Sequence, residues 1–223
     1  MIIIQFSDFN DADNIINTQY QAEWNEISSS LTQMPLHIKP SDQAKKQGNP
    51  IFDPVGSNQY IKNSLVKQGW HSNILIPAAY RFLGKDVDFG KSGIILESQF
   101  SNYPFLLNNL LRSELFFKAS IHFAGNVTKL LVIITKAQMF PASNSTLYYE
   151  QAVQQLTALI ENNVFDIPIR LIGLFEQPNV TISAIYTVYQ STRYSRVAQT
   201  QIERNCQIIP STPRSKRYKI QII

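Results

Sequence analysis

Apolar and polar residues recur along this chain with two different periods, and the change of period separates expected helices from expected strands. In four stretches apolar residues return every three or four positions, as on one face of an amphipathic helix. These stretches cover residues 11–33, 58–68, 104–119 and 146–162. Asp11 stands where its side chain can cap the first of these helices.

Continuous apolar runs, and alternation with a period of two, predict the strands. The run at residues 1–6 carries no basic leader, so we expect a first strand and no signal peptide. Further strands are expected at 129–136, at 167–175 and at 180–189, and as short strands around a basic turn at 213–217. Residues 35–54 are polar and punctuated by proline, which predicts mainly loop.

Strands and helices alternate after residue 93, which predicts an α/β fold. We expect a central mixed β-sheet flanked by helices, with an additional C-terminal β subdomain. A length of 223 residues suits one structural unit. We divide it into a core with dimerisation helices over 1–178 and a basic, β-rich extension over 179–223. The stretch 104–119 is apolar on more than one face, which suits contact with a second subunit as well as with the core.

Two acidic residues and an amide gather in an expected hairpin over residues 88–99, with its turn at 90–93. Side chains alternate along a strand, so Glu97 and Gln99 share a face, and pairing of the two strands brings Asp88 towards them. Converging carboxylates are what a hard divalent cation such as Mg²⁺ needs, and such a site suits phosphodiester hydrolysis. The residues alone leave a solvated or salt-bridged pair open as the alternative.

Basic residues are concentrated near the C-terminal end. Residues 193–223 hold seven of the 20 basic residues and one of the 16 acidic ones, so they carry a formal charge of +6 and the preceding residues carry −2. This asymmetry fits a nucleic-acid backbone as partner, and equally a solvated extension. The single cysteine, Cys206, excludes an internal disulfide, and no stretch has the length of a membrane span. We therefore expect a cytoplasmic protein with no membrane partner.

Several long segments resemble the BglII-type restriction endonucleases of the PD-(D/E)xK nuclease superfamily, between about residues 34 and 196. The matching segments are MPLHIKPSDQA from Met34, IFDPVGSNQYIK from Ile51, DVDFGK from Asp86, QFSNYPFLLNN from Gln99, RSEL from Arg112, MFPASNSTLYYEQA from Met139 and RYSR from Arg193. The resemblance implies the superfamily's core fold and a bacterial or archaeal homodimer that cuts palindromic double-stranded DNA with Mg²⁺. It also implies AGATCT as the target, cut after the first A to leave 5′ GATC overhangs, and a cognate DNA methyltransferase.

The same resemblance assigns roles in the active site. Asp88 matches the metal-binding aspartate, and Glu97 matches the second acidic catalytic residue. Gln99 stands where the superfamily usually has lysine, and Asn73 matches an asparagine near the active site. The main-chain carbonyl of Ser98 is expected as a further metal ligand.

Polar loop residues and arginines are the expected DNA contacts. They are Ser101, Asn102, Arg112, Ser143, Asn144, Ser145, Arg193, Tyr194 and Arg196. Asparagine can pair bidentately with adenine in the major groove, and arginine can reach guanine or phosphate. Taken alone, the two Ser/Asn loops are more typical of helix caps than of DNA contacts, and Arg112 is typical of a solvated helix surface. The RYSR segment is assigned to DNA by the resemblance.

Overall fold

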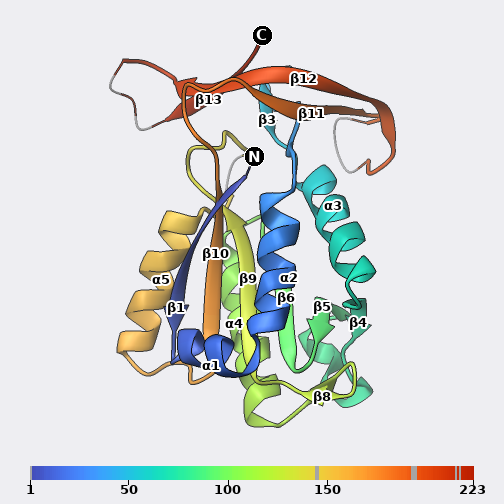
Figure 1. Cartoon of the computed structure of the whole chain (residues 1–223), viewed down its shortest axis with the longest axis vertical. Coiled ribbons are helices and arrows are strands. Elements are labelled where there is room, and N and C mark those ends of the chain that lie inside the picture. Colours follow the sequence, from blue (N-terminus) through green and yellow to red (C-terminus); the bar gives the residue numbers. More distant parts are fainter. Residues whose placement is uncertain (1, 144–145, 192–194, 214, 216) are drawn as a thin grey trace.

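Two β-sheets organise the chain, one inside the core and one across its end (Figure 1). The computed structural model describes residues 2–143, 146–191, 195–213, 215 and 217–223. Asn144, Ser145, Arg193 and Tyr194, four of the expected DNA contacts, lie outside the described residues. The α/β fold class expected from the sequence is confirmed.

The core sheet is mixed and has six strands. In spatial order they are β1 (Ile3–Phe9), β10 (Ile169–Phe175), β9 (Leu130–Lys136), β6 (Ile94–Ser98), β5 (Asp86–Lys91) and β4 (His71–Leu75). The central strands β10, β9 and β6 run parallel, and the strands on either side of them are antiparallel to their neighbours. All seven residues of β9 are buried, as expected for a strand covered on both faces.

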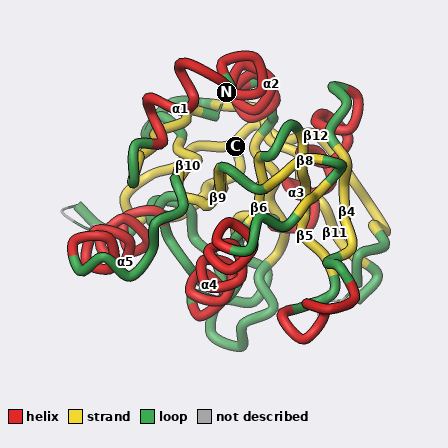
Figure 2. The backbone as a smooth tube through the Cα atoms, turned by 90° about the horizontal axis from the view of Figure 1, so that it is seen from below, coloured by secondary structure: helices red, strands yellow, loops and turns green. Residues whose placement is uncertain are grey.

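Helices cover both faces of this sheet (Figure 2), and the sheet separates the hydrophobic core into two clusters. One face carries α1 (Ala12–Gln19), α2 (Gln21–Thr32) and α3 (Pro54–Lys67). The other carries α4 (Pro104–Lys118) and α5 (Tyr149–Glu161), next to the 3₁₀-helix η1 (Ala78–Leu83). Because side chains alternate along β6, Leu96 packs in the first cluster and Ile95 in the second.

The second sheet has five strands drawn from two distant parts of the chain. Its order is β13 (Tyr218–Ile222), β12 (Ala198–Pro210), β11 (Ile182–Tyr189), β2 (Leu36–Pro40) and β3 (Pro50–Phe52). A separate two-stranded ribbon joins β7 (His122–Phe123) to β8 (Asn126–Val127). The prediction of mainly loop over 35–54 missed β2 and β3, because β2 depends on pairing with the C-terminal strand β11 and β3 in turn pairs with β2. The extension over 179–223 therefore shares its sheet with residues of the core.

Two details at the start of the chain differ from the expectation. The single helix predicted over 11–33 is broken at Tyr20, whose backbone is not helical (φ −127°, ψ 25°). Asp11 precedes α1 in the left-handed region (φ 63°) and makes no capping hydrogen bond. Its carboxylate instead accepts a hydrogen bond from the Asn14 side chain, so the predicted cap is wrong. Among the described residues, no helix is both long enough and apolar enough to cross a membrane.

Candidate active site

The hairpin of β5 and β6 has the expected position and opens where its acidic residues lie. Its two-residue turn, Ser92-Gly93, has positive φ at both positions, as a tight hairpin requires. The ladder between the strands runs up to the pair Phe89–Leu96. The next pair in this register is Asp88 opposite Glu97, and it is not part of the ladder. The two strands therefore separate at the two carboxylates.

Asp88 faces the main chain of Ser98 across this opening. Its Oδ2 accepts a hydrogen bond of 2.9 Å from the Ser98 N–H. The N–H of Gln99 donates to Ile134 O on β9, at 2.7 Å, and successive residues of a strand direct their main-chain groups to opposite sides. The Ser98 carbonyl therefore points towards β5, on the same side as the Asp88 carboxylate. Burial raises the pKa of Asp88, while the Ser98 N–H and the charge of Arg112 oppose that rise.

Glu97 is buried with only 2% of its surface exposed. Its Oε1 lies 2.5 Å from the Arg112 guanidinium. Burial nevertheless raises the pKa of Glu97 to about 8, because desolvation outweighs the attraction of Arg112 and the charge of Asp88 adds to the rise. Asp88 and Glu97 thus form a pair of neighbouring carboxylates whose ionised forms are both disfavoured. A cation between them relieves that penalty.

Arg112 lies inside the protein, behind Glu97. It is 9% exposed on the inner side of α4, and its second guanidinium nitrogen donates to the Asp86 carbonyl at 3.1 Å. This geometry favours a role beside Glu97 over the contact with a base or phosphate that we assigned from the sequence. The sequence carried a signal of this burial, because Asn109, Arg112 and Ser113 share the otherwise apolar buried face of α4.

Gln99 connects the active-site strand to the following loop. Its Nε2 donates to Asn102 O at 3.1 Å and to Ser101 Oγ at 3.3 Å. Its Oε1 accepts from Asn109 Nδ2 at 3.2 Å. Within the described part of the chain, the Gln99 amide is therefore held by this loop and by α4. The sequence analysis missed Asn109, the residue on α4 that holds it.

Asn73 lies on β4 opposite Asp88, at the one gap in the β4–β5 ladder between the pairs Ser72–Phe89 and Ile74–Val87. Its backbone has φ 52°, the left-handed region that few residues other than glycine adopt. The Asn73 Oδ1 accepts a hydrogen bond from Lys62 Nζ at 2.9 Å. Strained backbone of this kind clusters at functional sites, and Asn73 lies directly across from Asp88.

 The residues expected to read DNA lie on two loops that touch one another. Ser101 and Asn102 are exposed, and they pair with the start of the segment before α5. Leu147 N–H donates to Ser101 O at 2.9 Å, and Asn102 forms an isolated β-bridge with Thr146. Ser143 is exposed, and its carbonyl accepts the Thr146 hydroxyl at 2.7 Å. The two loops therefore form one surface next to Gln99.

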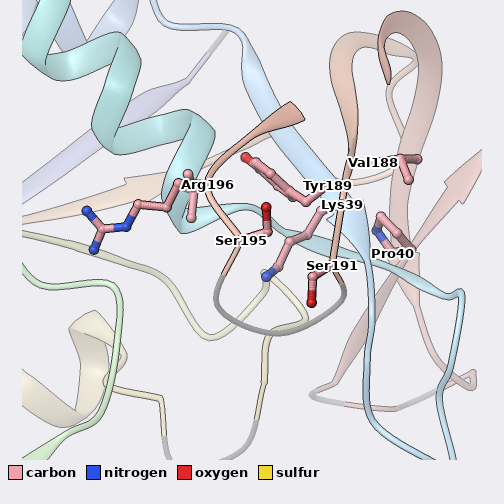
Figure 3. A pocket seen from close by; sticks show the side chains of 8 residues that line it. Lys39, Pro40, Val188, Tyr189, Ser191, Ser195 and Arg196 are labelled. Atoms are coloured by element: carbon pink, nitrogen blue, oxygen red, sulfur yellow. The ribbon is translucent and has the colours of Figure 1, made fainter. Parts of the chain in front are cut away.

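Arg196 lies in another part of the molecule, at the tip of the hairpin of β11 and β12. There a pocket of ≈ 280 Å³ lies between this tip and β2. Figure 3 shows Lys39, Tyr189, Ser191 and Ser195 gathered around the pocket, while Arg196 extends away from them. Arg196 is exposed, as a residue that contacts a DNA backbone needs to be.

The donor atoms at the opening of the hairpin fit Mg²⁺ in chemical type. Asp88 and Glu97 supply carboxylate oxygens and Ser98 a carbonyl oxygen, and oxygen ligands are what this ion prefers. In the part of the chain that the structure describes, no group of three or more His, Cys, Asp or Glu side chains is placed to hold a metal. Such a site therefore depends on two carboxylates, the main chain and water, as Mg²⁺ sites commonly do.

Comparison with known proteins shows which family the chain belongs to. The family model described as restriction endonuclease BglII/BglIII matches residues 4–174. The chain belongs to this family. It is 52% identical to the type II restriction enzyme BglII of Bacillus subtilis over 217 residues, which cover 97% of this chain and 96% of that enzyme. The chain is thus a type II restriction endonuclease.

Two solved structures of the BglII restriction endonuclease are also similar to the whole chain. The crystal structure of its complex with a DNA 16-mer has a TM-score of 0.93 and 51% identity, covering 99% of this chain and 100% of that one. The crystal structure of free BglII has a TM-score of 0.76 and 45% identity, with the same coverage. The arrangement described above therefore resembles the DNA-bound relative more than the free one.

Proposed function

We propose that this restriction endonuclease makes Mg²⁺-dependent double-strand cuts in the palindrome AGATCT, after the first A, and leaves 5′ GATC overhangs. The observation that carries the proposal is the opening of the β5–β6 hairpin at Asp88 and Glu97, beside the Ser98 main chain. The 52% identity to BglII over nearly the whole chain supports the same chemistry and a related target. We propose that the enzyme acts in the cytoplasm of a bacterium or archaeon that also carries a protecting DNA methyltransferase.

Asp88 and the Ser98 carbonyl would hold the metal ion. When bound, Mg²⁺ stabilises the charge that develops on the scissile phosphate and lowers the pKa of a bound water. Glu97 would orient the attacking water and, in its ionised form, take up the proton of that water through a second water, and a cation bound beside it favours that form. Arg112 holds the Glu97 carboxylate in place from behind.

Gln99 would act through position rather than through charge. An amide neither carries a positive charge nor takes up a proton, so it cannot replace the lysine that the superfamily usually has at this position. Its three hydrogen bonds, to Ser101, Asn102 and Asn109, hold the first base-reading loop against the active-site strand. We propose that this contact sets the distance between the bases that are read and the phosphate that is cut.

A homodimer follows from the need to cut both strands of a palindrome. Helix α4 supports it, because this helix is apolar on two sides. Leu106, Leu110 and Phe116 are fully buried in the core. Leu107, Leu111 and Leu115 form a stripe at every fourth residue on the opposite side, and they are 42%, 61% and 36% exposed. We propose that this stripe packs against the same stripe of a second copy.

Contact with DNA would come from the loops of residues 101–102 and 143–145 and from the 193–196 segment. The first loop lies directly beside Gln99, and Ser101, Asn102 and Ser143 are exposed. A second opening, of ≈ 630 Å³, lies behind the 141–146 loop and is lined in part by Lys46, Arg217 and Lys219. Among the described residues that line it there is no acidic side chain. These cations suit the backbone of the same duplex.

Digestion of plasmid DNA tests the proposal. The purified protein is incubated with Mg²⁺ and a plasmid that carries a single AGATCT site, and a plasmid in which that site is changed to GGATCC serves as the matched control. We expect one linear product from the first plasmid and none from the second, and end-sequencing should find 5′ GATC overhangs. Cutting of both plasmids would show a different GATC-containing target. Shifted but uncut DNA would show a DNA-binding dimer without catalysis.

A further inference from the structure

Lys136 ends strand β9 as a cation enclosed in the core. Its side chain is fully buried, with 0% of its surface exposed. Its Nζ donates a hydrogen bond of 2.8 Å to the Phe100 carbonyl. The ring centroids of Phe52, Tyr148 and Phe100 lie 5.3, 5.5 and 6.0 Å from the same nitrogen. Among the residues that the structure describes, no carboxylate forms a salt bridge with it.

A buried cation without an anionic partner needs an explanation other than stability. Taking an ammonium group out of water is costly, and aromatic faces and one carbonyl repay only part of that cost. This desolvation cost lowers the pKa of Lys136 to about 7. A methionine of similar length fills such a space without a charge.

The position of Lys136 connects it to both base-reading loops. Its acceptor, Phe100, directly follows Gln99 and directly precedes the loop of Ser101 and Asn102. The ring of Tyr148 belongs to the segment that leads from the second loop into α5. The ring of Phe52 belongs to a residue whose N–H donates to the Pro141 carbonyl at 2.8 Å, at the other end of that second loop. The Lys136 side chain therefore contacts segments that adjoin both loops.

Lys136 lies on the wrong face of the sheet to take part in the chemistry. Along β9, Val132 and Ile134 share its face and pack in the cluster under α1, α2 and α3. Glu97 points to the opposite face, where Arg112 and α4 lie. The lysine can therefore act on the reaction only through the segments that it holds.

We propose that Lys136 is a positioning residue that fixes the two base-reading loops relative to each other and to Gln99, and so couples recognition of the DNA sequence to cleavage. The inference rests on the proposed function. The hydrogen bond sets the Phe100 carbonyl and with it the start of the first loop, while the contact with Tyr148 sets the end of the second. Without this side chain the loops can shift against each other. A variant that lacks it should therefore distinguish the cognate duplex from a duplex with one changed base pair less well than the wild type does.

The variant Lys136→Met tests this role, with Lys129→Met as the matched control. Lys129 is an exposed lysine that directly precedes the other end of the same strand. The measured quantity is kcat/KM on the cognate duplex divided by kcat/KM on duplexes with one base pair changed. We expect Lys136→Met to lower this ratio at least tenfold while its thermal midpoint stays equal or rises, and Lys129→Met to change neither.

Amide hydrogen exchange supplies a readout that does not depend on cleavage. The Leu147 N–H bonds to Ser101 O and so reports directly on the contact between the loops. Its exchange should be faster in Lys136→Met than in the wild type and unchanged in Lys129→Met. An unchanged ratio with unchanged exchange would overturn the inference. So would an equal loss of activity on all duplexes together with a lower thermal midpoint, because that result means general destabilisation.

Failure of the proposed function has a different signature from failure of this inference. A wild-type enzyme that cuts no duplex refutes the proposed function, and the exchange of Leu147 then still decides whether Lys136 holds the loops. A wild type that discriminates among duplexes, next to a Lys136→Met variant that discriminates equally well, refutes the inference alone.

Discussion

Replacing Asp88 by asparagine separates the chemical role of this carboxylate from its structural role. The amide keeps an oxygen that can accept the 2.9 Å hydrogen bond from the Ser98 N–H, so the opening of the hairpin should be preserved. Burial raises the pKa of Asp88, which means that the charged form is already disfavoured in the fold. We therefore expect the free energy of unfolding to change by less than about 1 kcal/mol, or to rise.

The effect on cleavage should be far larger than the effect on folding. A neutral amide is a weak ligand for a divalent cation, and loss of one electrostatic contact to the transition state costs roughly 3–4 kcal/mol, or about 10²–10³ in rate. The single-turnover rate on a cognate duplex with Mg²⁺ measures this loss. Gel shifts without Mg²⁺, and sedimentation, should show that duplex binding and the dimer are retained.

The matched control is Asp86→Asn, two residues earlier on the same strand. Asp86 contributes its main-chain carbonyl to Arg112, and its carboxylate raises the pKa of Asp88. We expect this variant to lose less than about tenfold in rate, because its carboxylate acts on the site only through space. An Asp88→Asn enzyme that cuts within tenfold of the wild type, or an Asp86→Asn enzyme that loses equally much, would refute the assignment of the metal to Asp88.

Three further predictions concern the buried charges. In the fold Glu97 keeps its proton up to about pH 8, whereas the unfolded chain loses it near pH 4.5. The free energy of unfolding, measured by urea titration, should therefore fall as the pH rises between these values, and Glu97→Gln should make that fall less steep. The pKa of Lys136 is lowered from 10.5 to about 7, so between these pH values the lysine is protonated in the unfolded chain but not in the fold. The free energy of unfolding of the wild type should therefore rise relative to that of Lys136→Met as the pH rises from 7 to 10.5. Above about pH 8, where Glu97 is ionised, Arg112→Met leaves its carboxylate buried without a cation and should cost about 3–5 kcal/mol in urea unfolding, while unchanged stability at that pH would show that the pair is not coupled.

The long elements of this fold were predictable from periodicity. The buried strand β9 and the helix α4 have apolar patterns that only one kind of element satisfies, and both begin and end within a residue or two of the prediction. The strands β2 and β3 were not predictable in this way. They are short and contain proline. β2 exists as a strand because β11 supplies a partner from a distant part of the chain, and β3 pairs with β2. The break at Tyr20 was equally hidden, because apolar residues continue on both sides of it.

The direction of the side chains along the active-site strand was predictable from the sequence, but their contacts with other elements were not. The alternation along β6 correctly placed Glu97 on one face, and the hairpin brought Asp88 next to it. The sequence could not reveal that Arg112 reaches Glu97 from α4, or that Lys136 donates a hydrogen bond to Phe100 beside the loop of Ser101 and Asn102. Both contacts join residues far apart in the chain, and they depend on how α4 and the loops pack on the sheet.

Anomalous scattering from Mn²⁺ tests the central claim most directly. Crystals of the enzyme with a duplex that contains AGATCT and a non-hydrolysable scissile linkage are grown with Mn²⁺ in place of Mg²⁺. We expect an anomalous peak from a Mn²⁺ ion that is bound by the Asp88 carboxylate and the Ser98 carbonyl, next to Glu97 and the scissile phosphate. A peak held by other residues, with none at Asp88, would contradict it.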